Sequence, residues 1–403
     1  MSFSSLRRRI GSSRLILPLY VPFFFVSFLR GMLAPVLPLY AGSFGVSYGL
    51  IGLLLAGEAL GTLAADLPSG LLLRRLGARR TALVGVACAA LCTLACSWAR
   101  SVPEALLYQA LGGAGAACYH VALHAYLTGA TTVNDRGRAI ATYGGIMRIG
   151  GFAGPAVGGA LASAGGLRLP FAVAGAGYVT ALALITAYLR PSDGPSGAAQ
   201  SGLRHLAATL RGRYRTVATA GVAQIMGQTI RAGRAIVIPL YAADVLGLDV
   251  SAIGIIVSLS SAVDMSLFYP AGLLMDRLGR KFAIVPSFIV QAAGMALIPL
   301  TGSFGSLLGA SMLMGFGNGL GSGTMMTLGS DLAPPQSRSE FLGAWRLIGD
   351  TGFSAGPLAV GGLADLFVLP IAIWAVSATG LGAALICLLF VPETLRADRR
   401  AEG

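Results

Sequence analysis

A series of long apolar runs constrains the fold of this chain more than any other feature of its sequence. A helix that crosses a bilayer needs about 20 consecutive apolar residues, and because lipid offers the backbone no hydrogen-bond partner, such runs predict spanning helices. The runs cover residues 15–40, 48–73, 81–99, 103–129, 138–163, 169–189, 215–242, 250–274, 282–301, 304–329, 339–364 and 368–391. With 55% hydrophobic and 11% charged residues, the chain is predicted to be an all-α polytopic membrane protein with twelve transmembrane helices.

Basic residues between these runs indicate the orientation. Lysine and arginine gather in cytoplasmic loops. One set of alternate loops carries only Arg100 and Arg168, and every other basic residue between the spans lies in the opposite set or at the termini. We therefore expect a multi-pass protein of the cell inner membrane with both termini in the cytoplasm. The net charge of +13 follows from this sorting, so no nucleic-acid partner is needed to explain it.

The chain repeats itself after about 200 residues. GLLLRRLGAR, which begins at Gly70, is matched by GLLMDRLGRK, which begins at Gly272, and other matches occur at nearly the same spacing. This regularity indicates a duplicated architecture of two pseudo-symmetric six-helix bundles, expected in a monomer. The expected parts are a cytoplasmic leader (1–14), a first bundle (15–189), a cytoplasmic linker (190–214), a second bundle (215–391) and a cytoplasmic tail (392–403).

Polar side chains inside the spans mark the candidate site. An ionised group at the centre of a spanning helix costs ~2.5–3.5 kcal/mol, so it normally faces protein or a water-filled cavity. These groups fall in stripes at helical spacing, and every third span carries no charge. The candidates for substrate binding or coupling are Arg30, Glu58, Arg148, Gln228, Arg231, Asp264, Arg346 and Asp350.

Two pairs of residues four apart on one helix each have a functional and a structural interpretation. Arg346 and Asp350 could form a gate or coupling network with Arg148, or could neutralise each other. His120 and His124 could bind a metal or carry protons, but two ligands do not make a metal site. A histidine pair in the core is the alternative for the second pair.

The remaining charged candidates also leave two interpretations open. Glu58 and Asp264 are candidates for a proton-titrating carboxylate. Arg30 and Arg231 could hold an anionic substrate group from opposite halves, or could pair with the carboxylates.

No cofactor, metal site or catalytic centre is expected. The chain has no GxxxxGK[ST] phosphate loop, and its five cysteines all fall inside predicted spans as small apolar residues. No nucleophile with an adjacent base is evident. We therefore expect a protein that is neither an enzyme nor driven by ATP.

The repeated loop resembles a motif of the major facilitator superfamily, G-x-L-x-D-R-x-G-R-[RK], between the second and third helices of each half. The second copy fits at every position, whereas the first has Arg74 in place of Asp and Ala78 in place of Arg. In the family this Asp pairs between the halves and holds one conformation. The positions carried over as a conformational-gate motif are Gly272, Asp276, Arg277, Gly279, Arg280, Gly70, Arg75 and Gly77.

A second motif resembles the superfamily's proton-coupled drug and metabolite exporters. The run GGFAGPAVGG matches the G-x-x-x-G-P-x-x-G-G pattern of their fifth helix, and its helix-packing residues are Gly150, Gly154, Pro155, Gly158 and Gly159. Ordinary close packing of small residues is the alternative, because the eleventh span has its own GFSAGP. The chain also departs from the exporters in the fourth span, where a glutamine stands in place of their arginine.

Together these features predict a secondary active transporter that works by alternating access, in which two bundles rock about a midplane site. The exporter resemblance favours efflux of a small organic molecule or drug in exchange for protons. An importer of an organic anion or sugar, by symport or uniport, is the alternative, favoured by five arginines against four acids inside the spans.

Overall fold

The computed structural model describes residues 19–131, 133–189, 203–334 and 338–395. The expected leader, residues 190–202 of the expected linker and residues 396–403 of the expected tail lie outside the described residues. Within the described residues every regular element is helical. The chain divides into two compact units, of which unit 1 comprises Met1–Phe44 and Gly57–Gly197 and unit 2 comprises Gly45–Ala56 and Ala198–Gly403.

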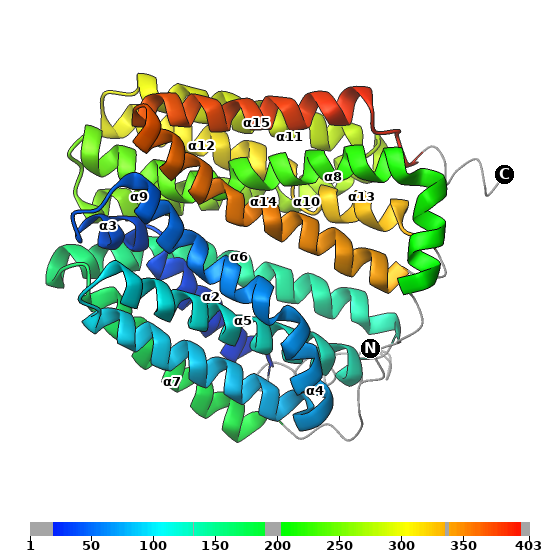
Figure 1. Ribbon diagram of the computed structural model, residues 1–403, viewed down its shortest axis with the longest axis horizontal. Coiled ribbons are helices and arrows are strands. Elements are labelled where there is room, and N and C mark those ends of the chain that lie inside the picture. The colour runs from blue at the N-terminus through cyan, green and yellow to red at the C-terminus, as the bar shows by residue number, and fades with distance from the viewer. Residues whose placement is uncertain (1–18, 132, 190–202, 335–337, 396–403) are drawn as a thin grey trace, which may run out of the picture. The chain divides into compact units, whose positions relative to one another are not determined.

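The described part of each expected span lies in a helix or in a broken helix (Figure 1). The first half contains α2 (Val21–Leu33), α3 (Val36–Gly42), α4 (Tyr48–Trp98), α5 (Val102–Ala130), α6 (Val133–Gly165) and α7 (Leu169–Tyr188). The second half contains α8 (Leu203–Leu240), η2 (Tyr241–Val245), α9 (Val250–Ser266), α10 (Phe268–Arg277), α11 (Lys281–Leu297), η3 (Ile298–Leu300), α12 (Phe304–Leu320), α13 (Thr324–Leu332), α14 (Arg338–Leu366) and α15 (Leu369–Leu389).

Breaks at proline and glycine explain why the spans and the helices differ in number. The helices α2 and α3 form one bent span, with an angle of 42° between them and Pro35 immediately before α3. Conversely, α4 contains two expected spans, joined at Gly77, whose φ of 77° interrupts the helical backbone. Five described helices are long and apolar enough to cross a membrane, or six with the bent pair. The helix α12 is shorter than a full span because the chain breaks before α13.

The internal repeat is visible in how the helices pack within each unit. The helix α2 contacts α6 and α7 in unit 1, and its counterpart α8 contacts α14 and α15 in unit 2. Two matching tyrosines make matching hydrogen bonds: the Tyr40 hydroxyl donates to the Cys96 carbonyl at 2.6 Å, and the Tyr241 hydroxyl donates to the Thr301 carbonyl at 3.0 Å. Each hydrogen bond joins the end of the first expected span of its half to the end of the third expected span.

Candidate functional site

One pocket in unit 2 brings together four of the candidate residues. It has a volume of about 230 Å³ and is lined from α8, α13 and α14. The lining consists of Gln224, Gln228, Arg231, Gly323, Met325, Met326, Trp345, Arg346, Gly349 and Asp350. Apolar side chains with a few converging polar groups are typical of a small-molecule site.

A break between α12 and α13 forms one wall of this pocket. Gly323 has a φ of 75°, a left-handed conformation that side chains disfavour. The carbonyl oxygen of Gly321 accepts a hydrogen bond from Nη2 of Arg231 at 3.3 Å. Interrupted helices at membrane depth are tolerated where they face protein or line a cavity. The break therefore places backbone polar groups next to the pocket.

Arg346 and Asp350 face each other across one turn of α14. Nε of Arg346 lies 3.6 Å from Oδ2 of Asp350, and the two side chains are 45% and 35% exposed. At this exposure the attraction is screened and contributes ~0–1 kcal/mol. The pairing that the sequence left open is therefore formed, and both residues also line the pocket. A weak pair of this kind can be opened by a proton or by a charged ligand.

The helix α8 supplies another part of the pocket wall. The guanidinium carbon of Arg231 lies 5.3 Å from the centre of the Phe288 ring, within the range of a cation–π interaction. The carboxamide of Gln224 lies against α14, where a Cβ added at Gly349 would be 2.6 Å from its nitrogen. Gly349 therefore makes room for a buried amide at the pocket wall.

In unit 1, Arg30 and Glu58 form an ion pair. Nη2 of Arg30 lies 3.0 Å from Oε1 of Glu58, with the side chains 47% and 28% exposed. This is the structural alternative that the sequence left open for Arg30. In the repeat, Arg231 matches Arg30, but Ser260 stands at the position that matches Glu58. The hydroxyl of Ser260 donates to the carbonyl of Ser311, so the two units differ in charge at this position.

Two further candidates are not among the residues that line the pocket. Oδ2 of Asp264 accepts a hydrogen bond from Nδ2 of Asn318 at 2.9 Å, between α9 and α12. Arg148 is half-buried in α6 of unit 1. Its expected network with Arg346 and Asp350 stays a prediction.

His120 and His124 belong to an aromatic cluster in unit 1. Nδ1 of His120 lies 3.2 Å from the Tyr143 hydroxyl oxygen, and the centre of the His124 ring lies 5.3 Å from that of Tyr143. The Phe23 ring stacks on Tyr143 with centres 3.9 Å apart. Among the described residues no three histidine, cysteine or acidic side chains are placed to hold a metal ion.

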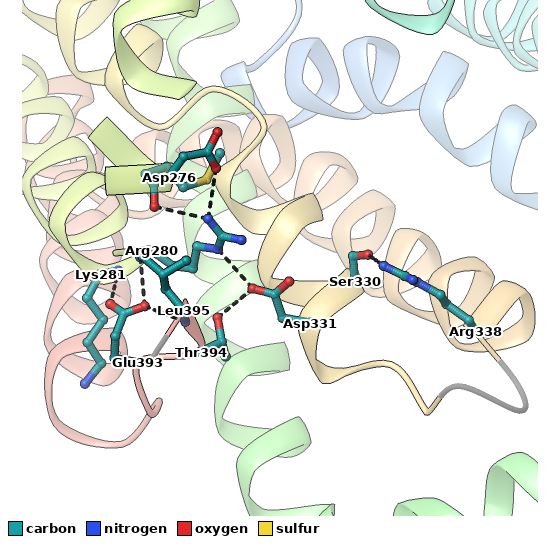
Figure 2. A network of polar contacts seen from close by, with 10 residues as sticks. Asp276, Arg280, Lys281, Ser330, Asp331, Arg338, Glu393, Thr394 and Leu395 are labelled. Carbon is teal, nitrogen blue, oxygen red and sulfur yellow. Dashed lines mark hydrogen bonds and ion pairs between the residues drawn. The ribbon is translucent and has the colours of Figure 1, made fainter. Parts of the chain in front are cut away.

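The second copy of the gate motif is held by an ionic network within unit 2 (Figure 2). Arg280 donates to Asp331 at 3.0 Å and to Asp276 at 3.1 Å. The side chains of Arg280 and Asp331 are only 11% and 13% exposed, and the Thr394 hydroxyl donates to the same Asp331 oxygen at 2.6 Å. Burial lowers the pKa of Arg280, but the hydrogen bonds and charges of Asp331 and Asp276 outweigh it and raise this pKa overall.

Glu393 joins the segment after α15 to this network. Its carboxylate accepts the backbone N–H groups of Arg280 at 2.9 Å and Lys281 at 3.0 Å, at the N-terminus of α11, where negative charge is favourable. Gly279, with a φ of 123°, leaves room for the carboxylate. Sequence patterns do not connect Glu393 or Asp331 with the loop, because these contacts span 51 to 113 residues.

The predicted helix-packing glycines bring α6 close to α2. A Cβ added at Gly150 or Gly154 would lie 2.7 or 2.5 Å from backbone nitrogens of α2, and one at Gly158 would overlap the Met32 carbonyl. Pro155 and Gly159, the other motif residues, are buried. In unit 2, Gly352 and Gly356 of α14 meet α8 in the same way. Close packing thus accounts for the motif in both halves, and this packing does not distinguish export from import.

These features define a class of protein: a helical membrane protein built from two repeated bundles, with charged residues and a broken helix around an internal pocket. A profile of the Major Facilitator Superfamily matches residues 19–228 and 217–403. The chain belongs to this superfamily and is a membrane transporter with its fold.

Individual relatives agree with this assignment. The chain is 23% identical over 341 residues to the uncharacterized MFS-type transporter MJ1560 of Methanocaldococcus jannaschii, covering 83% of this chain and 87% of that protein. It is 28% identical over 183 residues to Multidrug resistance protein 2 of Bacillus subtilis, covering 45% and 44%. Its fold is similar to that of a bacterial homolog of the human lysosomal transporter Spinster in an inward-facing, occupied conformation, with a TM-score of 0.79, 18% identity and coverage of 94% and 96%.

Proposed function

We propose that this chain is a proton-coupled exporter of a small organic molecule, in which Asp350 exchanges protons. The observation that carries the proposal is that Asp350, Arg346 and Arg231 line one pocket beside a broken helix. A substrate that displaces Arg346 contacts the ionised carboxylate of Asp350, and protonation of Asp350 removes this contact and favours release. Loss of the proton restores the carboxylate, so proton and substrate occupy the site in turn. Glu58, paired with Arg30, is a second candidate for the same exchange.

Export is supported by the similarity to Multidrug resistance protein 2 over 45% of this chain. The substrate is first found by growing a transporter-deficient host that carries this chain on a panel of toxic compounds and carbon sources. In everted vesicles, an acid interior drives accumulation of the substrate by an exporter that exchanges it for protons. An importer that uses proton symport instead releases preloaded substrate, which would overturn the proposed direction.

A second candidate function is import of an organic anion or sugar. Arg231 and Arg346 both line the pocket, with Asp350 as its acid, so the lining carries a net positive charge that favours an anion. Carbon-source growth together with release from acid-interior everted vesicles would support this function over export.

The membrane arrangement completes the proposal. Arginines that sort by loop favour an inner-membrane protein with both termini in the cytoplasm. We propose that the protein works as a monomer, with protons and the substrate as its small partners.

A further inference from the structure

We propose that the loop around Gly77 binds the head group of an anionic phospholipid. The binding surface consists of Arg74, Arg75, Arg80, Leu67 and Leu71, all in unit 1, and is called the first-half basic cluster below. The proposal goes beyond transport, since it concerns the lipid that surrounds the protein and does not depend on substrate or direction.

No acidic side chain in the described part of the chain forms an ion pair with the three arginines of this cluster. Arg74, Arg75 and Arg80 are exposed. The neighbouring Arg79 differs, because its Nη2 donates to the Thr186 carbonyl at 2.7 Å. The acid that precedes the cluster on the same helix, Asp66, is about 12 Å from Arg74 along the helix axis.

The duplicated loop in unit 2 has acidic side chains that the first loop lacks. There, Asp276, Asp331 and Glu393 surround Arg280 and the start of α11. The positions that match these three acids in the first half are an arginine, a glycine and a proline. Acids of unit 2 therefore neutralise the second loop, whereas the described residues supply no acid that pairs with the arginines of the first. In our proposal the lipid head group supplies this negative charge.

Apolar side chains next to the arginines favour a phospholipid over a soluble phosphate. Leu67 and Leu71 are 85% and 61% exposed, and with Arg74 they fall at i, i+4 and i+7, on one face of the helix. A head-group phosphate on Arg74 and Arg75 would leave an acyl chain to run over the two leucines, about 10 Å along the helix. The matching residues of unit 2, Tyr269 and Leu273, are also exposed, at 73% and 39%. The two loops therefore offer similar apolar surfaces but different charge.

This difference supplies a matched test within one chain. A tryptophan is placed at either site, as Leu71→Trp or Leu273→Trp, in the full chain with Trp98 and Trp374 replaced by Phe. Each protein is reconstituted in phosphatidylcholine containing brominated phosphatidylglycerol or brominated phosphatidylcholine, and quenching gives the relative affinity for the anionic lipid. We expect a preference for phosphatidylglycerol at position 71 and a ratio near 1 at position 273.

Charge variants then identify the residues responsible. We expect a lower preference for phosphatidylglycerol over phosphatidylcholine at position 71 in each of three variants, Arg74→Gln, Arg75→Gln and Arg80→Gln. One arginine near an anionic surface contributes ~1 kcal/mol, so each substitution should reduce this preference about fivefold or to a ratio near 1. Arg277→Gln, in the matching loop, should leave it unchanged. Equal quenching by both lipids at position 71, or a preference that survives all three substitutions, would overturn the proposal.

Two measurements keep the result interpretable. The thermal unfolding midpoint of each variant shows whether it is folded. We expect all of the variants to fold, because each changes one exposed side chain, and only folded variants are compared. Inorganic phosphate is added at the concentration of the anionic lipid; we expect it to leave the quenching ratio unchanged. Displacement of the lipid by phosphate at equal concentration would show a site for a soluble anion and would overturn the assignment to lipid.

Discussion

At Gly279 the backbone and its surroundings both exclude a side chain. Its φ is 123°, and a Cβ would lie 2.6 Å from Oε2 of Glu393. We expect Gly279→Ala to lower the free energy of unfolding by ~1–3 kcal/mol. Gly272 in the same motif is helical, and a Cβ added there would have no neighbour within 4 Å. Gly272→Ala should therefore be neutral or stabilising by up to ~1 kcal/mol. Thermal unfolding in detergent compares the two; equal midpoints would contradict the role given to Gly279.

The carboxylate of Asp350 is the residue on which the proposed coupling depends. Asp350→Asn keeps the shape of the side chain but cannot exchange a proton, so transport driven by a pH gradient should fall at least about tenfold, while exchange of substrate at equal pH continues. Glu104→Gln is the control, because Glu104 lies in the first turn of α5, where its carboxylate accepts the Arg100 N–H. Gradient-driven transport by Asp350→Asn at the parent rate would assign the coupling to another residue, with Glu58→Gln as the next variant.

Among helices and loops, the network around Arg280 contains two ion pairs of very different burial. Asp331 is 13% exposed and Asp276 is 70% exposed. Removing one partner of a buried pair costs ~3–5 kcal/mol, whereas an exposed pair contributes ~0–1 kcal/mol. Asp331→Asn should therefore lower the unfolding midpoint and increase hydrogen exchange at the start of α11, and Asp276→Asn should change both only slightly. The reverse order would mean that burial does not determine the strength of this network.

The contact between α2 and α6 depends on glycines on one face of α6. A Cβ added at Gly154 would lie 2.5 Å from the Met32 nitrogen, whereas a Cβ added at Gly151 would have no neighbour within 4 Å. Gly154→Ala should destabilise the protein by ~1–3 kcal/mol through overpacking, and Gly356→Ala should do the same in unit 2. Gly151→Ala serves as the matched control. Thermal unfolding of the three variants tests this, and a stable Gly154→Ala protein would show that the helices can separate at little cost.

For the whole molecule, the arginine sorting predicts the side on which each end lies. Single cysteines near residues 2 and 402 should resist a membrane-impermeant maleimide in intact cells and react in everted vesicles. A cysteine at Gly302, between η3 and α12, should show the opposite pattern. The native cysteines are buried or half-buried, and the parent chain measures their background. Labelling of both termini in intact cells would reverse the proposed topology.

The sequence predicted more of the architecture than of the contacts. Apolar runs and a 200-residue repeat suffice for the fold, since both are local or periodic signals. Arg231, Arg346 and Asp350 stood out because charge inside a span is costly. The contributions of Gly323, Met326 and Trp345 to the pocket could not be predicted, because they depend on where α12 breaks and on how α13 then packs. The pairing of Arg30 with Glu58 likewise could not be predicted, because it depends on how the helices pack and helical spacing does not determine it.

The position of Trp345 makes the pocket observable without a label. This indole is 1% exposed, donates to the Met325 carbonyl at 2.9 Å and contributes to the pocket wall. The other two tryptophans, Trp98 and Trp374, are 69% and 47% exposed at the protein surface, so collisional quenchers that enter both water and lipid reach them first. The residual blue-shifted emission of the unlabelled protein therefore comes mainly from one chromophore, and titrating compounds against that signal ranks ligands before any flux assay exists.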